Sequence, residues 1–282
     1  MNRFLPLLPL LTLIALLPQR ASADTTIGTE ITSLPYTIST SGAYYIEKNL
    51  AYTPTSGVAI RIEAIDAVLD LNGFELVTGG SANTSYAISC NHYDRATVKN
   101  GTIRGFQTGV NLLSNACTVT NLLVADNFQT GINVVGNNVQ ILSNHVCGTG
   151  GSTAAGVTYS VGISLTGSSG TVTDNDVQTT VITDKGSHYA DGILITGGSN
   201  IVVSNNRVLG IVPLTPEFAL SNGIAINSSE NLVILGNTVI SAHTGFYLPG
   251  AASGKYGDNI TTGVSTSYDT TGSGIVNIGG NN

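Results

Sequence analysis

The chain has 282 residues, of which 41% are hydrophobic, 10% are charged and none is tryptophan. Its formal net charge is −7, with 10 basic against 17 acidic residues. So few cations argue against nucleic acid and anionic membrane surfaces as partners, because both are bound through basic patches. Neutral glycans, or acidic glycans bridged by a cation, suit this charge better.

The first 23 residues have the pattern of a cleaved signal peptide. Arg3 supplies a positive start, an apolar run covers Leu5 to Leu17, and Ala21-Ser22-Ala23 fits the small-x-small cleavage rule. The apolar run is shorter than the ~20 residues that a membrane-spanning helix needs. We therefore expect a secreted or periplasmic protein without membrane insertion once residues 1–23 are removed.

The three cysteines are too few for a disulfide-rich scaffold. At most one disulfide bond can form among Cys90, Cys117 and Cys147, and no two of them are spaced as Cys-x-x-Cys. We expect buried structural cysteines and no metal site of that kind.

A strand start of glycine followed by an apolar residue recurs along the chain. The glycines are separated by steps of 22, 31, 30, 31 and 22 residues, at Gly109, Gly131, Gly162, Gly192, Gly223 and Gly245. A second pattern, apolar-x-x-Asn-x-Val, places an asparagine at positions 144, 175, 206 and 237, three equal steps of 31. Regular repeats with short strands and glycine turns are typical of a solenoid.

The repeat predicts an all-β protein, a parallel β-helix (solenoid) of about nine coils. The asparagines should form a ladder inside the turns, each bonding to the next coil, and the valines two residues later should line the core. We expect an N-terminal cap at 24–57, the β-helix at 58–261 and a loose C-terminal cover at 262–282. Val98 to Ile103 and Val119 to Val124 carry the same frame with the asparagine one place earlier.

Three consecutive coils are about nine residues longer than the others, and the excess falls at one corner. The predicted loops 147–161, 178–191 and 209–222 should therefore stack into one wall, and long loops on one side of a solenoid usually form its binding side. The middle loop is the richest in chemistry. The candidate residues are His188, Asp191 and Lys185 for catalysis; Tyr189, Tyr159, Glu217, Phe218, Asn222 and His243 for substrate binding; and Asp184 with Asp191 for Ca²⁺, which would be an optional cofactor.

Three stretches resemble a known family. Ile65 to Phe74, Val98 to Phe106 and the Gly-Ile-x-Ile coils are similar to right-handed parallel β-helix proteins of the pectin-lyase-like superfamily, and look closest to secreted bacterial members of undefined activity. The resemblance implies a right-handed helix. It does not imply one activity, because this fold hosts lyases, hydrolases, epimerases and inert rods.

Polygalacturonases of this superfamily carry four catalytic motifs just before such strand starts. Tyr189-Ala190-Asp191 resembles the first motif, Ser221-Asn222 lacks the carboxylate of the second, and His243-Thr244-Gly245 matches the third only in part. Hydrolysis needs a pair of carboxyl groups around the bond. Two functions therefore stay open: a secreted protein that contacts extracellular or envelope polysaccharide as a binding or structural element, and a lyase, epimerase or hydrolase acting on a uronate-containing glycan.

Overall fold

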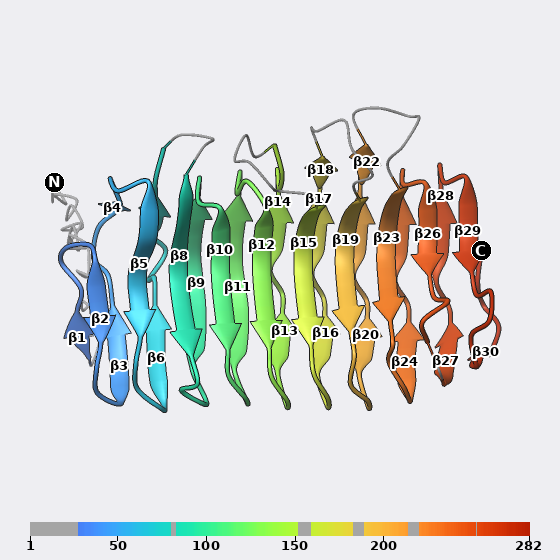
Figure 1. Cartoon of the computed structure of the whole chain (residues 1–282), viewed down its shortest axis with the longest axis horizontal. Helices are drawn as coiled ribbons and strands as arrows, with labels where there is room; N and C mark the ends of the chain where they lie inside the picture. Colours follow the sequence, from blue (N-terminus) through green and yellow to red (C-terminus); the bar gives the residue numbers. More distant parts are fainter. Residues whose placement is uncertain (1–27, 80–82, 152–158, 183–188, 214–219, 252) are drawn as a thin grey trace, which may run out of the picture.

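The computed structural model describes residues 28–79, 83–151, 159–182, 189–213, 220–251 and 253–282. These residues form strands and turns with no helix, and the strands stack as coils along one long axis (Figure 1). Because the described part contains no helix at all, none is long and apolar enough to cross a membrane. The predicted signal peptide lies outside the described residues.

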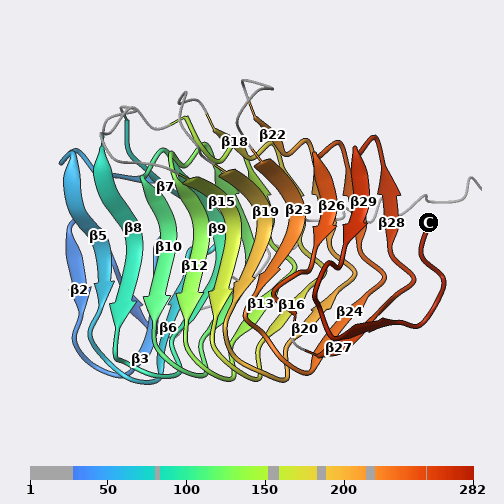
Figure 2. The same cartoon turned by 45° about the vertical axis from the view of Figure 1, so that its right-hand side comes forward.

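One side of the coil is a ten-stranded parallel sheet, with one strand from each coil (Figures 1 and 2). Its strands are β2 (Tyr36–Ile38), β5 (Ser56–Ile62), β8 (Thr84–Asn91), β10 (Thr108–Leu113), β12 (Thr130–Val135), β15 (Tyr159–Thr166), β19 (Tyr189–Thr196), β23 (Leu220–Asn227), β26 (Thr244–Tyr247) and β29 (Thr266–Asp269). Both β2 and β29 belong to this sheet, although they lie outside residues 58–261, where the coils were expected.

The other sides form an 18-stranded sheet that bends into two strips. The first strip contains β1 (Thr29–Glu30), β3 (Gly42–Tyr45), β6 (Ala67–Asp70), β13 (Gln140–Leu142), β16 (Thr171–Thr173), β20 (Val202–Ser204), β24 (Leu232–Leu235), β27 (Gly254–Gly257) and β30 (Ile275–Asn277). The second contains β4 (Leu50–Ala51), β7 (Glu75–Val77), β14 (His145–Cys147), β17 (Asp176–Gln178), β21 (Arg207–Leu209), β25 (Thr238–Ile240) and β28 (Ile260–Thr262). The longer β9 (Thr97–Arg104) and β11 (Thr118–Ala125) run through both strips.

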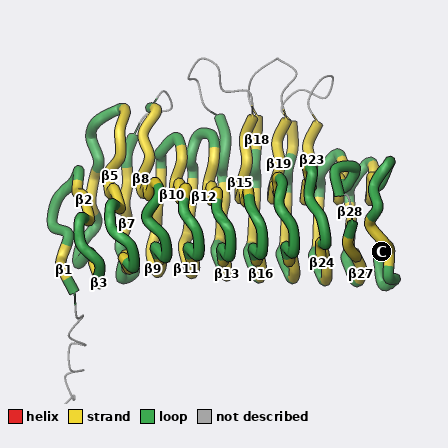
Figure 3. The backbone as a smooth tube through the Cα atoms, turned by 60° about the horizontal axis from the view of Figure 1, so that its bottom comes forward, coloured by secondary structure: helices red, strands yellow, loops and turns green. Residues whose placement is uncertain are grey.

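The strand pairing continues past the predicted boundaries at residues 58 and 261. β1 pairs with β3 and β2 with β5 near the N-terminal end, while β29 pairs with β26 and β30 with β27 at the other. Every one of these pairings is parallel. Residues 29–51 and 266–277 thus belong to the same stack of coils (Figure 3).

The predicted asparagine ladder is confirmed. The Asn206 amide oxygen accepts the backbone N–H and the side-chain N–H of Asn175, each at 3.0 Å, and Asn206 in turn donates both groups to Asn237 at 3.0 Å. The ladder extends in the same way to Asn259 and Asn281. It holds the corner between the two strips of the 18-stranded sheet.

The residue before each ladder position explains why this corner turns. Ser143, Asp174, Asn205, Gly236, Asp258 and Gly280 all have φ between 53° and 70°. This left-handed conformation is tolerated best by Gly, Asn and Asp. Asn100 and Asn121, with φ of 58° and 54°, occupy this turning position and not the ladder position. That is why the asparagine of the earlier coils stands one place earlier in the sequence.

The interior is one continuous apolar core that runs the length of the stack. Columns such as Val146, Val177, Val208 and Val239 are fully buried. The repeated glycine faces this core: a Cβ on Gly162 would lie 2.4 Å from Val177 Cγ1 and 2.6 Å from the Gly192 carbonyl oxygen. A side chain does not fit where the backbones of adjacent coils approach so closely.

The cysteines are unpaired, and two of them are buried. Cys90 and Cys117 belong to the core, while Cys147 is half-buried. Burial raises the pKa of the Cys117 thiol to about 11. The expectation of buried structural cysteines is met by Cys90 and Cys117, whereas Cys147 is only half-buried. A raised pKa disfavours the thiolate, which is the nucleophilic and metal-binding form.

Candidate functional site

The long loops begin and end in register, so the described parts of the predicted wall do stack. At the start of the loops, Gly150 bridges to Val181 and β18 (Val181–Ile182) pairs in parallel with β22 (Val212–Pro213). At their ends, β15, β19 and β23 start side by side. Both sets lie at the upper edge of Figure 1. His188, Lys185, Asp184, Glu217 and Phe218 lie outside the described residues, so their predicted roles stay predictions.

Two tyrosines form an exposed aromatic surface where β15 and β19 begin. Tyr159 and Tyr189 are register partners, and their rings stack with centroids 5.9 Å apart and an interplanar angle of 14°. They are 36% and 40% exposed. Leu220 continues the column on β23 and is 57% exposed. Three adjacent coils thus present a flat, partly apolar strip.

Asp191 lies on the same face as Tyr189, two residues further along β19. Side chains alternate between the two faces of a strand, and the intervening Ala190 belongs to the core, so Asp191 points away from the core. Its register partners are Val161 and Asn222. The Asn222 side-chain amide donates to Asp191 Oδ1 at 2.8 Å.

The Asp191 carboxyl is nevertheless buried, with 2% of the residue exposed. Desolvation raises its pKa from 3.8 to about 7, and the hydrogen bond from Asn222 lowers the pKa only in part. Asp191 therefore exchanges a proton near neutral pH. A carboxyl group with this property can act as a proton donor or acceptor in the physiological range.

A small apolar cluster outside the core forms the floor next to Asp191. Val161, Leu194 and Ala225 are buried together, and Tyr247 packs against them. Sequence reasoning missed Leu194 and Tyr247 as members of the site. The sequence did contain a signal for Leu194. At the aligned position the three earlier coils carry the polar residues Asn111, Asn133 and Ser164, so an apolar residue at position 194 indicates that this part of the outer face is buried.

Asn222 lies inside the site beside Asp191, whereas His243 lies at its margin. Asn222 is 7% exposed and orients Asp191. His243 is exposed on the following coil, where its backbone N–H donates to Ser221 Oγ at 2.9 Å. It directly precedes Thr244, the register partner of Asn222. The structure thus brings Tyr159, Tyr189, Asp191 and Asn222 together and leaves His243 at the margin.

Within the described ranges, Asp191 is the sole carboxylate of its column, whose other members include Thr130, Val161, Asn222 and Thr244. The same part of the chain contains no group of three or more His, Cys, Asp or Glu residues that would hold a metal ion. Since Asp184 lies outside that part, the calcium site stays a prediction.

A charged column crosses the second strip of the 18-stranded sheet. Arg207 donates to Asp176 Oδ1 at 2.9 Å, and His145 Nδ1 lies 3.4 Å from Asp176 Oδ2. All three side chains are more than a third exposed. Exposed ion pairs contribute at most ~1 kcal/mol, and this column has the character of a solvated face.

Comparison with known proteins identifies the family. The model of the right-handed β-helix region matches residues 86–282. The chain belongs to this family. The right-handed parallel β-helix that the resemblance implies is thereby confirmed as the fold. No curated protein matches the sequence.

Solved structures of similar fold include two phage tailspikes. The Dettilon tailspike superposes with a TM-score of 0.55 at 9% identity, covering 88% of this chain and 60% of its own. Tailspike protein 2 of bacteriophage CBA120 has a TM-score of 0.50 at 14% identity, covering 84% of this chain and 38% of its own. The periplasmic alginate epimerase AlgG has a TM-score of 0.49 at 14% identity, covering 78% and 60%. At such identities the likeness concerns the fold alone. This chain covers less than two thirds of the length of each of these proteins.

Proposed function

We propose that this protein is exported and binds polysaccharide on the outer face of the ten-stranded sheet, over the first residues of β15, β19 and β23. The observation that carries the proposal is the exposed, stacked pair Tyr159 and Tyr189 beside the buried Asp191–Asn222 hydrogen bond. Export is supported by the signal pattern in residues 1–23.

The chemistry of this surface matches that of a sugar. An aromatic face with a polar edge supplies apolar contact to the C–H face of a sugar ring, while amide and carboxyl groups fix its hydroxyls. The two ring centroids lie 5.9 Å apart on adjacent coils, whose backbones are spaced by ~4.8 Å, so successive units of an extended chain meet successive coils.

The direct test is retention on immobilised polysaccharides, with neutral and uronate-containing chains in the panel. The full-length protein should be retained by at least one of them and released by the same soluble polysaccharide. If no polysaccharide retains the protein, the proposed function is wrong. Retention that the soluble polysaccharide does not reverse also counts against specific binding.

A second function is favoured by one specific observation, the pKa of about 7 at Asp191. A buried carboxyl that holds its proton near neutrality suits a general acid or base of a lyase, epimerase or hydrolase. The same panel, scored for unsaturated product by ultraviolet absorbance and for reducing ends, tests this activity. An enzyme should lose at least ~10²-fold in turnover in Asp191→Asn while it still binds, whereas a binding protein shows no turnover to lose.

A further inference from the structure

A separate hollow lies at the other end of the strands of the ten-stranded sheet, where β8, β10 and β12 finish. Its volume is about 570 Å³, within the ~300–1,000 Å³ of small-ligand sites. Three consecutive coils line it, with Asn91, His92 and Asp94 from the first, Leu113 and Asn115 from the second and Val135 from the third. These coils precede β15 and β19, so the hollow shares no residue with the Asp191 site.

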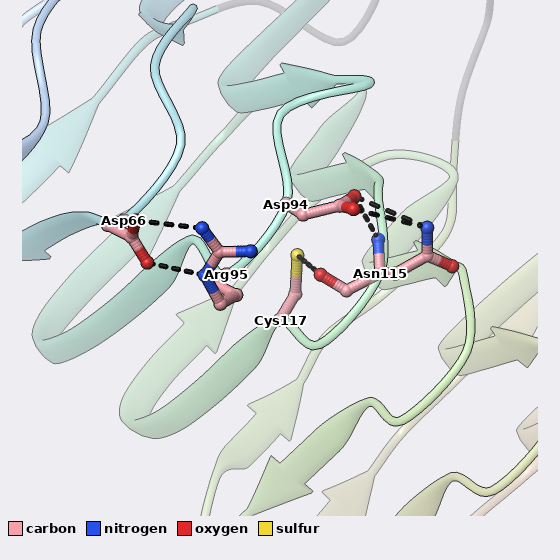
Figure 4. A network of polar contacts seen from close by, with 5 residues as sticks. All are labelled: Asp66, Asp94, Arg95, Asn115 and Cys117. Atoms are coloured by element: carbon pink, nitrogen blue, oxygen red, sulfur yellow. Dashed lines mark hydrogen bonds and ion pairs between the residues drawn. The ribbon is translucent and has the colours of Figure 1, made fainter.

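The wall of the hollow is held rigidly by hydrogen bonds between coils. The backbone N–H of Asn115 donates to Asp94 Oδ1 at 2.9 Å, and the Asn115 side chain donates to the same oxygen at 3.3 Å (Figure 4). The Asn137 backbone N–H repeats the first contact on Asn115 Oδ1 at 2.9 Å. Below them, buried Ser114 accepts the Tyr93 backbone N–H at 3.0 Å. Such a preorganised wall loses little entropy when a ligand binds.

Charges near the hollow are already engaged. Arg95, directly after Asp94, turns toward the preceding coil and donates from Nε and Nη2 to Asp66 at 2.5 and 2.8 Å (Figure 4). This guanidinium lowers the pKa of Asp66, and Asp94 is bonded to Asn115. The residues that line this larger hollow include no lysine or arginine, and Arg61 of the adjoining smaller hollow is paired with Glu63. A wall without a cation does not suit an anionic ligand, which is usually bound through Arg or Lys.

The exposed groups of the wall combine hydrogen-bonding side chains with an apolar edge. His92 and Asn91 are exposed, and Val135 is 38% exposed beside Leu113. A smaller hollow of about 200 Å³ shares Asn91 and continues onto the preceding coil, lined by Tyr93 and by the ion pair of Arg61 and Glu63 at 3.7 Å. The path therefore extends over four coils, further than one monosaccharide requires.

We propose that these two adjoining hollows form a second carbohydrate site, which binds a neutral oligosaccharide lying across the ends of β5, β8, β10 and β12. Hydroxyl groups bond to the Asn91 amide and the His92 imidazole, and the C–H face of a sugar lies against Val135 and Leu113. This second site takes the same class of ligand as the proposed polysaccharide site at Tyr189 and Asp191, but the two sites have no residue in common. Either site can therefore fail alone.

The test is calorimetric titration of the full-length protein with maltohexaose, cellohexaose and xylohexaose, and with hexagalacturonate as the anionic comparison. The variant combines His92→Asn with Val135→Thr. Asn tolerates the φ of 66° at position 92, and Thr keeps the shape of Val. The matched control is Thr196→Val, which lies in the Val135 column two coils further on.

The wild type should bind at least one neutral oligosaccharide, and the double variant should lose at least tenfold in affinity while Thr196→Val does not. Tyr189→Ala should leave this binding in place, which separates the second site from the first. The proposal is overturned if no neutral oligosaccharide binds, if hexagalacturonate alone binds, or if only Tyr189→Ala removes binding. Should the double variant not fold by circular dichroism, the single variants give the same comparison.

Discussion

Replacing one rung of the asparagine ladder should destabilise the whole solenoid. Asn206 is 1% exposed and makes four side-chain hydrogen bonds: it accepts two from Asn175 and donates to the Val172 carbonyl at 2.9 Å and to Asn237. In Asn206→Ala the backbone N–H of Asn175 and the carbonyl of Val172 lose these partners. Each buried group left unsatisfied costs ~1–3 kcal/mol, so we expect a loss of ~2–6 kcal/mol in the free energy of unfolding.

Circular dichroism during urea unfolding measures this loss directly. The matched control is Asn133→Ala, because Asn133 lies on the outer face of the ten-stranded sheet and makes a half-buried hydrogen bond to Asn111 at 2.8 Å. Such a bond contributes ~0.5–1.5 kcal/mol. If Asn206→Ala unfolds at the same urea concentration as Asn133→Ala, the ladder does not hold the coils together.

Three further predictions concern Asp191, the glycine column and calcium. The pKa of Asp191 is raised from 3.8 to about 7 in the folded state, so the folded protein binds this proton more tightly than the unfolded chain does. The free energy of unfolding should therefore fall by up to ~4 kcal/mol as the pH rises from about 3.8 to about 7, and stay constant above that pH. Asp191→Asn should flatten that part of the profile, and a profile equal to that of the wild type would contradict the assigned burial. Gly162→Ala places a Cβ 2.6 Å from the Gly192 carbonyl oxygen and should lower the free energy of unfolding by ~1–3 kcal/mol or more. Urea titration measures this loss, and an unchanged unfolding midpoint would refute the close approach of the two coils. If Asp184 and Asp191 hold Ca²⁺, excess Ca²⁺ should raise the melting temperature and a chelator should lower it, whereas a melting curve indifferent to both removes this pair as ligands.

The repeat made most of the fold predictable. Equal spacing of the asparagines fixed the ladder, because a solenoid places residues one period apart directly above one another. The two earlier coils matched less well, since Asn100 and Asn121 take the left-handed turning position and not the ladder position. Sequence letters do not distinguish these two positions, because asparagine suits both.

The site was predictable in its location and less so in its chemistry. The extra length of three coils pointed to the corner where Tyr159, Tyr189 and Asp191 meet, because an insertion must leave the stack on the side where it occurs. The burial of Asp191 and the packing of Leu194 with Tyr247 depend on neighbours far away in the chain. The hollow at His92 lies between turns of three coils, and its shape depends on how those turns pack against one another. Local pattern does not reveal such features.

Binding of polysaccharide to Tyr189→Ala, compared with Tyr45→Ala, tests the proposed site most directly. Both tyrosines are partly exposed, but Tyr45 belongs to β3 in the 18-stranded sheet, away from the proposed surface. On a polysaccharide that retains the wild type, Tyr189→Ala should bind ~2–12-fold more weakly, because a stacked aromatic ring is worth ~0.5–1.5 kcal/mol beyond the area it buries. Tyr45→Ala should bind like the wild type, and both variants should keep the wild-type circular dichroism spectrum. Equal binding by Tyr189→Ala and the wild type would show that polysaccharide is not bound on this face.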